Sequence, residues 1–180
     1  MTAEDKDIDW KIVDLEMARE IKAQGETFLH AQLQAAIASD QRATTMAGVC
    51  VTLATAVVAA GIAYWDKAGS FPILFGAFAG AVSLLFAAGC AGWSARPVDF
   101  YYPGNQPRQW YEARNADVKV ALGGEAENYD RHIASNQVIL TSSRKAINLA
   151  FWAAIMSPII GGAVWGGAEI IFSLFQAPTA

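Results

Sequence analysis

The chain has 180 residues, a formal net charge of −4, 54% hydrophobic residues and only 17% charged residues. This length fits one domain. The negative net charge and the acidic N-terminal stretch MTAEDKDID argue against a nucleic-acid polymer as partner. The same stretch lacks the basic start of a secretory signal, so we expect no cleavable signal peptide.

Charged residues are absent from three long segments, 43–65, 68–95 and 146–168, which contain 23, 28 and 23 residues. A helix rises about 1.5 Å per residue, so about 20 apolar residues cross the hydrocarbon core of a bilayer. A soluble fold would need three unusually long apolar core helices in one small domain. The segments therefore predict an all-α integral membrane protein with three transmembrane helices.

Polar and apolar segments alternate along the chain. The predicted organisation is a cytosolic amphipathic helix in 1–45, transmembrane helices in 46–65 and 71–93, a cytosolic loop with helices in 94–145, and a third transmembrane helix in 146–168, with an extension to 175 left open. The N-terminal helix and the lead-in to the third span together form a cytosolic helical extension.

The distribution of cations predicts the orientation. Of the 13 Lys and Arg residues, 12 lie in 1–45 and 94–145, and the other is Lys67, between the first two apolar segments. Lys and Arg in short loops favour the cytosolic side of a membrane. We therefore expect a cytosolic N-terminus and a C-terminus on the outside.

The N-terminal helix is predicted from a helical spacing of apolar residues: Trp10, Val13, Met17, Ile21, Phe28, Ala31 and Ala35. No proline occurs between residues 1 and 71, so this helix is expected to run on towards the first span.

The loop after the second span is irregular over residues 94–109, which contain three prolines and a glycine. A short helix is expected to start near 106–108 and to stop at Gly123–Gly124. A longer helix then begins at Glu125.

A heptad-like stripe runs along that longer helix: Tyr129, Ile133, Asn136, Leu140, Ser143 and Ile147. Its expected partner is the N-terminal helix. Asn136 lies in the middle of the stripe. It either fixes the register or contacts a ligand, or it is a solvated residue on a partly exposed face, and we favour solvation because a register role requires burial.

The second and third spans each contain a GxxxG sequence, GAFAG (76–80) and GAVWG (162–166). Glycines four apart let two helices approach closely in a membrane. Gly76, Gly80, Gly162 and Gly166 are therefore predicted helix-packing residues. The packing serves either a three-helix bundle or a homo-oligomer, and the sequence leaves both open.

Two further residues of the third span are candidates for function. Pro158 removes a backbone donor and is followed by several glycines, so it is either a hinge or an ordinary proline kink. Glu169 is either at the outer interface, which the length of the span favours, or a polar intramembrane residue facing a lumen.

Catalytic chemistry has little support in the sequence. His30 and His132 are the only histidines, and the interpretation we prefer is that both are surface residues. No nucleophile elbow, zinc-protease, P-loop or dinucleotide-binding motif occurs. We predict no enzyme activity, no catalytic residues, no cofactor and no metal site.

The residues Asp40-Gln41-Arg42-Ala43 directly precede the first span, after a cytosolic helix and before a tight two-span hairpin. In this order of features the chain resembles the small transmembrane effectors of nucleotide-signalled bacterial antiphage systems, the SLATT-type and transmembrane Pycsar effectors. The resemblance lies mostly in residues 29–93. It implies a location in the bacterial inner membrane, a nucleotide signal, and membrane disruption after activation.

Three hypotheses for the function follow. The first is a non-enzymatic membrane effector that forms a homo-oligomer and perturbs or permeabilises the inner membrane on a cytosolic signal. The second is a structural or accessory membrane anchor whose cytosolic helices dock a protein partner. The third is a small transporter or membrane enzyme, for which Glu169 is the one candidate residue.

Overall fold

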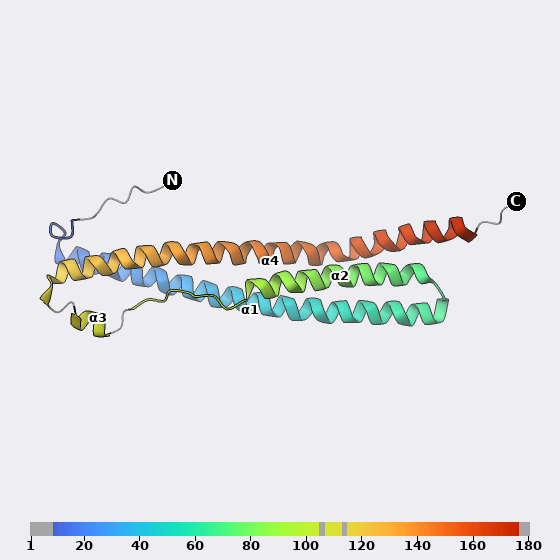
Figure 1. Cartoon of the computed structure of the whole chain (residues 1–180), viewed down its shortest axis with the longest axis horizontal. Helices are drawn as coiled ribbons and strands as arrows, with labels where there is room; N and C mark the ends of the chain where they lie inside the picture. The colour runs from blue at the N-terminus through green and yellow to red at the C-terminus, as the bar shows by residue number, and fades with distance from the viewer. Residues whose placement is uncertain (1–8, 105–106, 113–114, 177–180) are drawn as a thin grey trace. The chain divides into compact units, whose positions relative to one another are not determined.

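The computed structural model describes residues 9–104, 107–112 and 115–176. These residues form four helices and no strand, as the sequence predicts. The helices in chain order are α1 (Leu15–Ala68), α2 (Phe71–Ser94), α3 (Pro107–Glu112) and α4 (Val118–Gln176) (Figure 1). The all-helical fold class is therefore confirmed.

Three of these helices, α1, α2 and α4, are long and apolar enough to cross a membrane. Within the described residues, only 17%, 28% and 11% of their most apolar windows are buried by protein. The prediction of three apolar helices of spanning length is confirmed. Their side chains are mostly uncovered, as expected of helices surrounded by lipid.

The chain divides into two compact units. Unit 1 comprises Met1–Ile37 and Val98–Leu140, and unit 2 comprises Ala38–Pro97 and Thr141–Ala180. Both α1 and α4 contribute to both units, whereas α2 belongs to unit 2 and α3 to unit 1. Unit 2 contains the three uncharged segments of the sequence.

The predicted stop at Gly123–Gly124 is wrong, because α4 begins at Val118 and runs through both glycines. The physical reason is packing against Trp10. A Cβ atom on Gly123 would collide with the Trp10 indole, whereas one on Gly124 would meet no described atom within 4 Å. Gly123 therefore admits a neighbouring ring and does not end a helix.

The core of unit 1 lies between the first part of α1 and the first part of α4. Its buried residues are Trp10, Ala18, Leu29, Gln32, Leu122, Glu125, Ala126, Tyr129 and Asn136. The predicted pairing of these helices is confirmed by two contacts. Tyr129 packs against Gly25, and the Gln32 Nε2 donates to the Ile133 carbonyl at 3.2 Å.

The buried face of α1 in unit 1 differs from the predicted stripe. Met17 and Phe28 are exposed by 56% and 53%, whereas Ala18 and Leu29 are fully buried. The bulky Tyr129 ring requires a small neighbour on α1, and Gly25 provides it. As a result, the face of α1 that packs against α4 is shifted by one residue from the predicted stripe, and the larger apolar side chains lie on the outside.

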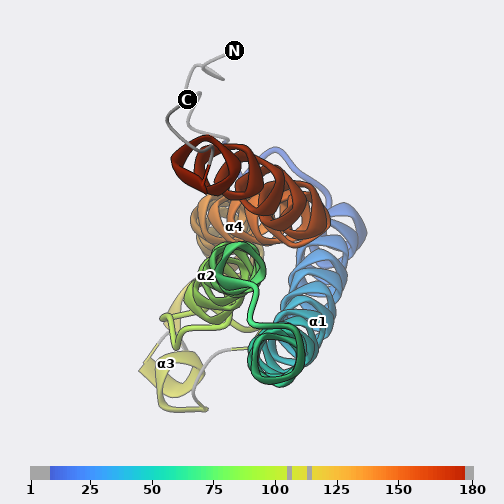
Figure 2. The same ribbon diagram turned by 90° about the vertical axis from the view of Figure 1, so that its right-hand side faces the viewer.

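In unit 2, α1 and α2 form a hairpin whose turn passes through Gly69 at φ 65°. This left-handed backbone is strained for other residues. Helix α2 lies between α1 and α4 (Figures 1 and 2). A small apolar cluster joins all three helices: Cys50 and Ala54 on α1, Leu84 and Ala87 on α2, and Ala153 and Ala154 on α4.

Candidate functional site

The contact between α2 and α4 in unit 2 is built from small residues. A Cβ atom on Gly76 would lie 2.7 Å from the Gly161 carbonyl oxygen, so the two backbones approach more closely than any larger residue allows. The Ser157 hydroxyl, which is buried, donates to the Gly80 carbonyl at 2.8 Å. The Ser83 hydroxyl donates to the Ala153 carbonyl at 3.0 Å. Such close backbone packing is typical of membrane helices.

The predicted packing glycines thus have different roles. Gly76 and Gly80 face α4 at close range, where their neighbours include Gly161 and Ser157, which are not among the predicted packing residues. A Cβ atom on Gly162 or Gly166 would meet no described atom within 4 Å. Packing by these two glycines therefore stays a prediction for contacts between copies of the chain.

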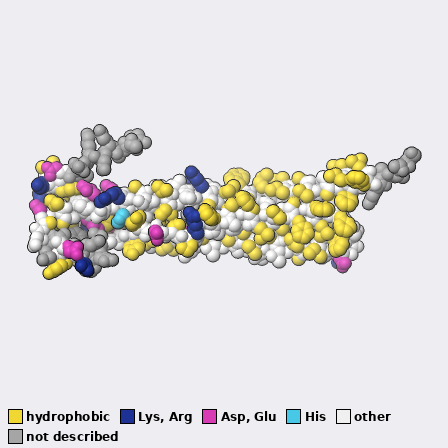
Figure 3. All heavy atoms as spheres, in the orientation of Figure 1, with side chains coloured by type: hydrophobic (Ala, Val, Ile, Leu, Met, Phe, Trp, Pro, Cys, Tyr) yellow, Lys and Arg dark blue, Asp and Glu magenta, His cyan; other side chains and the backbone are white. Residues whose placement is uncertain are grey.

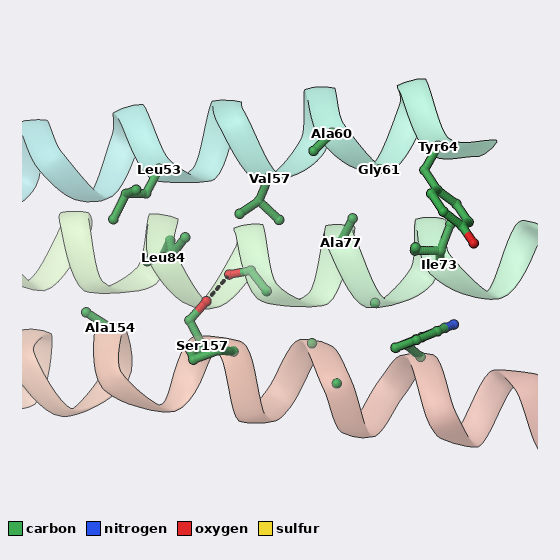
Figure 4. A pocket seen from close by; sticks show the side chains of 16 residues that line it. Leu53, Val57, Ala60, Gly61, Tyr64, Ile73, Ala77, Leu84, Ala154 and Ser157 are labelled. Carbon is green, nitrogen blue, oxygen red and sulfur yellow. Dashed lines mark hydrogen bonds between the residues drawn. The ribbon is translucent and has the colours of Figure 1, made fainter. Parts of the chain in front are cut away.

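A groove of about 560 Å³ opens in unit 2 beside this seam. All three long helices line it, with Leu53 and Val57 pointing from α1 towards α2 and Ser157 pointing from α4 towards α2 (Figure 4). The inner end lies at Leu53, Leu84 and Ala154, and the other end at Tyr64 and Trp165.

Small residues contribute much of the lining of this groove from α2 and α4. Gly76, Ala77 and Gly80 line it from α2, and Gly161 and Gly162 line it from α4. Most of the lining is apolar, and the one hydroxyl near its centre, that of Ser157, is already hydrogen-bonded. The groove therefore offers an apolar surface with no free polar group at its centre, which suits another helix better than a polar ligand.

Pro158 also lines this groove, and α4 continues past it to Gln176. Its ring has no N–H to donate to the Ala154 carbonyl, so the helix lacks one hydrogen bond here. The structure places this weakened turn beside Ser157 and its contact with α2. The hinge function of Pro158 stays a prediction.

Glu169 is exposed on α4, well before the helix ends. The antiparallel register of Gly76 with Gly161 and of Gly80 with Ser157 can be extended along both helices. It brings Glu169 to about the level of the turn at Gly69. This level supports the interfacial placement, which stays a prediction.

Residues 98–104, which have no regular secondary structure, form a segment that we call the strap. Unit 1 holds a polar clamp, which we define as Asn136 and Tyr129 on α4 with the strap residues Tyr101 and Gly104. The Tyr101 N–H donates to Asn136 Oδ1 at 3.0 Å, and Asn136 Nδ2 donates to the Tyr101 carbonyl at 2.8 Å. Asn136 is completely buried. The preferred interpretation of Asn136 as a solvated residue is therefore wrong. Its buried side-chain amide bonds the N–H and the C=O of Tyr101, as a neighbouring strand would do in a β-sheet.

Tyr129 fastens the other end of the strap. It is 2% exposed, and its hydroxyl accepts a hydrogen bond from the Gly104 N–H at 3.3 Å. Burial, followed by the hydrogen bond and negative charge of Glu125, raises the pKa of Tyr129 to about 12. The phenol therefore stays protonated at neutral pH and can donate to the Glu125 carboxylate while it accepts from the strap.

The Tyr101 ring stacks on His132, with centroids 4.3 Å apart and an interplanar angle of 8°. His132 is half-buried, whereas His30 is exposed. The expectation of two surface histidines is therefore wrong for His132. Within the described residues, no group of three His, Cys, Asp or Glu side chains is placed to hold a metal ion.

The segment before α1 is fastened to α4 in the same unit. Trp10 Nε1 donates to Glu127 Oε1 at 2.7 Å, and Lys119 Nζ donates to the Lys11 carbonyl at 2.9 Å. The Trp10 ring covers Gly123. Unit 1 thus binds two non-helical segments to one helix through polar contacts.

Asp40 and Arg42, the residues of the predicted juxtamembrane motif, lie on α1 in unit 2 and are both exposed. They are two residues apart and so point to different sides of the helix. Arg42 lines a cavity along α1, and Asp40 is not among the residues that line that cavity.

Residues of the groove and the clamp that the sequence did not single out include Ser157, Gly161 and Tyr101. Gly161 and Ser157 stand next to predicted positions, so a search for small residues facing each other could have found them. Searches against protein-family models, curated proteins and solved structures found no match to this chain.

Proposed function

We propose that the chain is a non-enzymatic, three-span effector of a bacterial cytoplasmic membrane, with unit 1 in the cytosol. In this proposal the spans associate with those of other copies and perturb the membrane when unit 1 receives a signal. The observation that carries it is the apolar groove of about 560 Å³, which leaves the small-residue face of the three-helix contact open.

A helix of a second copy is the occupant that fits this groove best. The α1 wall runs from Leu53 to Tyr64, about 16 Å at the helical rise, so three turns of a helix can lie along it. Gly162, on the α4 side of the groove, allows close backbone approach. Gly162 has no described neighbour within its own chain and is thus available for such a contact.

Charge supports the membrane orientation. One end of unit 2 carries Asp40, Arg42, Arg96, Arg144 and Lys145, and the other carries Asp66, Lys67 and Glu169. The first end is net positive and the second net negative. Because Lys and Arg favour the cytosolic side, the end with Arg42 is assigned to the cytosol. In Figure 3, some of the Lys and Arg side chains lie next to the stretch where hydrophobic side chains cover most of the surface.

The clamp of unit 1 supports a switch. Because α1 and α4 belong to both units, a rearrangement of unit 1 reaches the spans through the same two helices. The strap is held by a few hydrogen bonds from Asn136 and Tyr129. A ligand that competes for these bonds, such as a nucleotide, would release it.

The test is controlled expression in a bacterial host with a dye that reports membrane potential. Asn136→Ala removes the clamp and is expected to depolarise the membrane, whereas Asn136→Ala with Gly162→Leu is expected to restore polarisation because the groove is filled. The matched controls are Asn115→Ala, at an exposed asparagine, and Gly89→Leu, at an exposed glycine outside the groove.

Normal polarisation with Asn136→Ala, at membrane levels equal to those of the parent chain, would contradict the effector proposal. Depolarisation that persists with Gly162→Leu would contradict the role of the groove. The first result tests the effector function, and the second tests whether a helix of a second copy occupies the groove.

A second function, a membrane anchor that docks a cytosolic protein, is favoured by one observation. Met17, Ile21 and Phe28 form an exposed apolar face on α1 in unit 1. Ile21 and Phe28 also line a cavity of about 450 Å³. Purification in mild detergent would yield a stoichiometric partner that Phe28→Glu removes, and a protein that elutes alone in both cases would exclude the anchor.

A further inference from the structure

A second cavity, of about 620 Å³, lies along α1 at the positively charged end of unit 2. One face of α1 forms nearly all of its lining, and Ala154 of α4 completes it. The lining changes from polar to apolar along the helix, first Gln41, Arg42 and Thr45, and then Met46, Val49 and Leu53. The cavity is therefore amphipathic, with a guanidinium at one end.

Arg42 has no counter-ion in the part of the chain that the structure describes. The nearest carboxylate in sequence, Asp40, is turned about 200° away around the helix and does not line the cavity. Within the described residues, the cation at the cavity mouth is thus left without a protein partner.

Other cations lie at the same level. The Ser94 hydroxyl donates to the Ser143 carbonyl at 3.1 Å, which brings the C-terminal end of α2 beside α4. Arg96 follows Ser94, and Arg144 follows Ser143, so both lie at this level. Arg42 lies eight residues before Cys50 of the apolar cluster, which is about 12 Å along α1. Ser94 lies seven residues after Ala87 of the same cluster, which is about 10 Å along α2. Arg42 and Ser94 are therefore at similar distances from the cluster.

We propose that this cavity binds one anionic phospholipid of the cytosolic leaflet. The Arg42 guanidinium holds the phosphate group, with Gln41 and Thr45 beside it, and one acyl chain lies along Met46, Val49 and Leu53. The proposal rests on the membrane placement in the proposed function, but on neither the signal nor the oligomer.

The dimensions match one leaflet. From Arg42 to Leu53 the helix rises about 16 Å, which is half of a hydrocarbon core of about 30 Å. A guanidinium offers paired donors to a phosphate, and basic pockets between membrane helices on the cytoplasmic side are suited to anionic headgroups. A free anion would leave the apolar half of the cavity unused, and no aromatic ring among the lining residues could stack on a nucleobase.

The experiment is native mass spectrometry of the full chain purified in mild detergent, titrated with phosphatidylglycerol or phosphatidylcholine. We expect one tightly bound phosphatidylglycerol per chain and weaker binding of phosphatidylcholine. Arg42→Gln is expected to lower the affinity for phosphatidylglycerol about tenfold, as the loss of a charge-assisted hydrogen bond would. Lys67→Gln, at the opposite end of unit 2, is the matched control and should change nothing.

A second variant tests the apolar half of the site. Val49→Trp fills the cavity while all cations remain, and it should lower the affinity for phosphatidylglycerol as well. Glycerophosphoglycerol, the soluble headgroup alone, and inorganic phosphate should not displace the lipid. Arg42→Lys keeps the charge and should bind more tightly than Arg42→Gln, which separates loss of binding from loss of folding.

Three results would overturn the lipid site: equal binding by Arg42→Gln and the parent chain, equal binding of the two lipids, or displacement by the soluble headgroup. Failure of the membrane proposal looks different, because the chain would then be recovered from cells without detergent. The lipid site therefore stands or falls separately from the effector function.

Discussion

Asn136 on α4 exchanges two hydrogen bonds with the backbone of Tyr101, 35 residues away in the chain. The amide is completely buried and satisfies both the N–H and the C=O of one strap residue. Asn136 thereby fixes a segment that has no regular secondary structure of its own.

Asn136→Ala is expected to lower the free energy of unfolding by about 2–4 kcal/mol, because it leaves two backbone groups of the strap without partners. Thermal unfolding in mild detergent measures the change, and limited proteolysis should then cut within residues 98–104. Asn115→Ala changes an exposed asparagine and should leave both measurements unaltered. Equal stability of the two variants would show that the clamp does not hold the strap.

Gly123 and Gly124 are neighbouring glycines, and we expect substitution by alanine to have different effects on stability at the two positions. Gly123→Ala pushes a methyl group into the Trp10 ring and should destabilise unit 1 by about 1–3 kcal/mol. Gly124→Ala meets open space and should be neutral or stabilise α4 by up to about 1 kcal/mol. Tryptic cleavage after Lys11, measured over time, should be faster only for Gly123→Ala. If both variants were cleaved alike, Trp10 would not pack on Gly123.

Gly76→Ala tests the seam between α2 and α4. The added methyl would lie 2.7 Å from the Gly161 carbonyl oxygen, so the helices must separate, at a cost of about 1–3 kcal/mol. Gly89→Ala in the same helix meets no described atom and is the matched control. Unfolding by an anionic detergent, followed by circular dichroism, should show an earlier transition for Gly76→Ala alone. Identical transitions would argue against this seam.

Tyr129 gives unit 1 a dependence on alkaline pH. Its pKa is about 12 in the folded chain and about 10 in an unfolded one. The folded state therefore keeps the phenol proton more tightly, and this contribution is complete below pH 10 and lost as the pH rises from 10 to 12. The loss amounts to about 2–3 kcal/mol.

The free energy of unfolding, measured at several pH values between 9 and about 12, should therefore fall less with rising pH for Tyr129→Phe than for the parent chain. Tyr102→Phe removes a tyrosine that is 70% exposed and should leave the curve unchanged. A parent curve that coincides with that of Tyr129→Phe would mean that Tyr129 is not buried against Glu125.

The helices of spanning length were predictable because their signal is local: charge stops at Arg42 and returns at Asp66. The clamp was not, because Asn136 and Tyr101 have no common pattern in the sequence. The inner face of α1 was missed because apolar residues occur at several registers, and the bulk of Tyr129 selects Gly25 as the contact. Gly123 was misread because glycine ends helices and also admits neighbouring rings.

The placement of three spans in a membrane is tested most directly by labelling single cysteines with a membrane-impermeant maleimide in a bacterial host, after Cys50 and Cys90 are replaced by alanine. Ser70→Cys, in the α1–α2 turn, should be labelled in intact cells, and Ser39→Cys, on α1 before the first uncharged segment, only after the cells are opened. Labelling of both positions only after opening, or recovery of the chain in a detergent-free extract, would contradict the account.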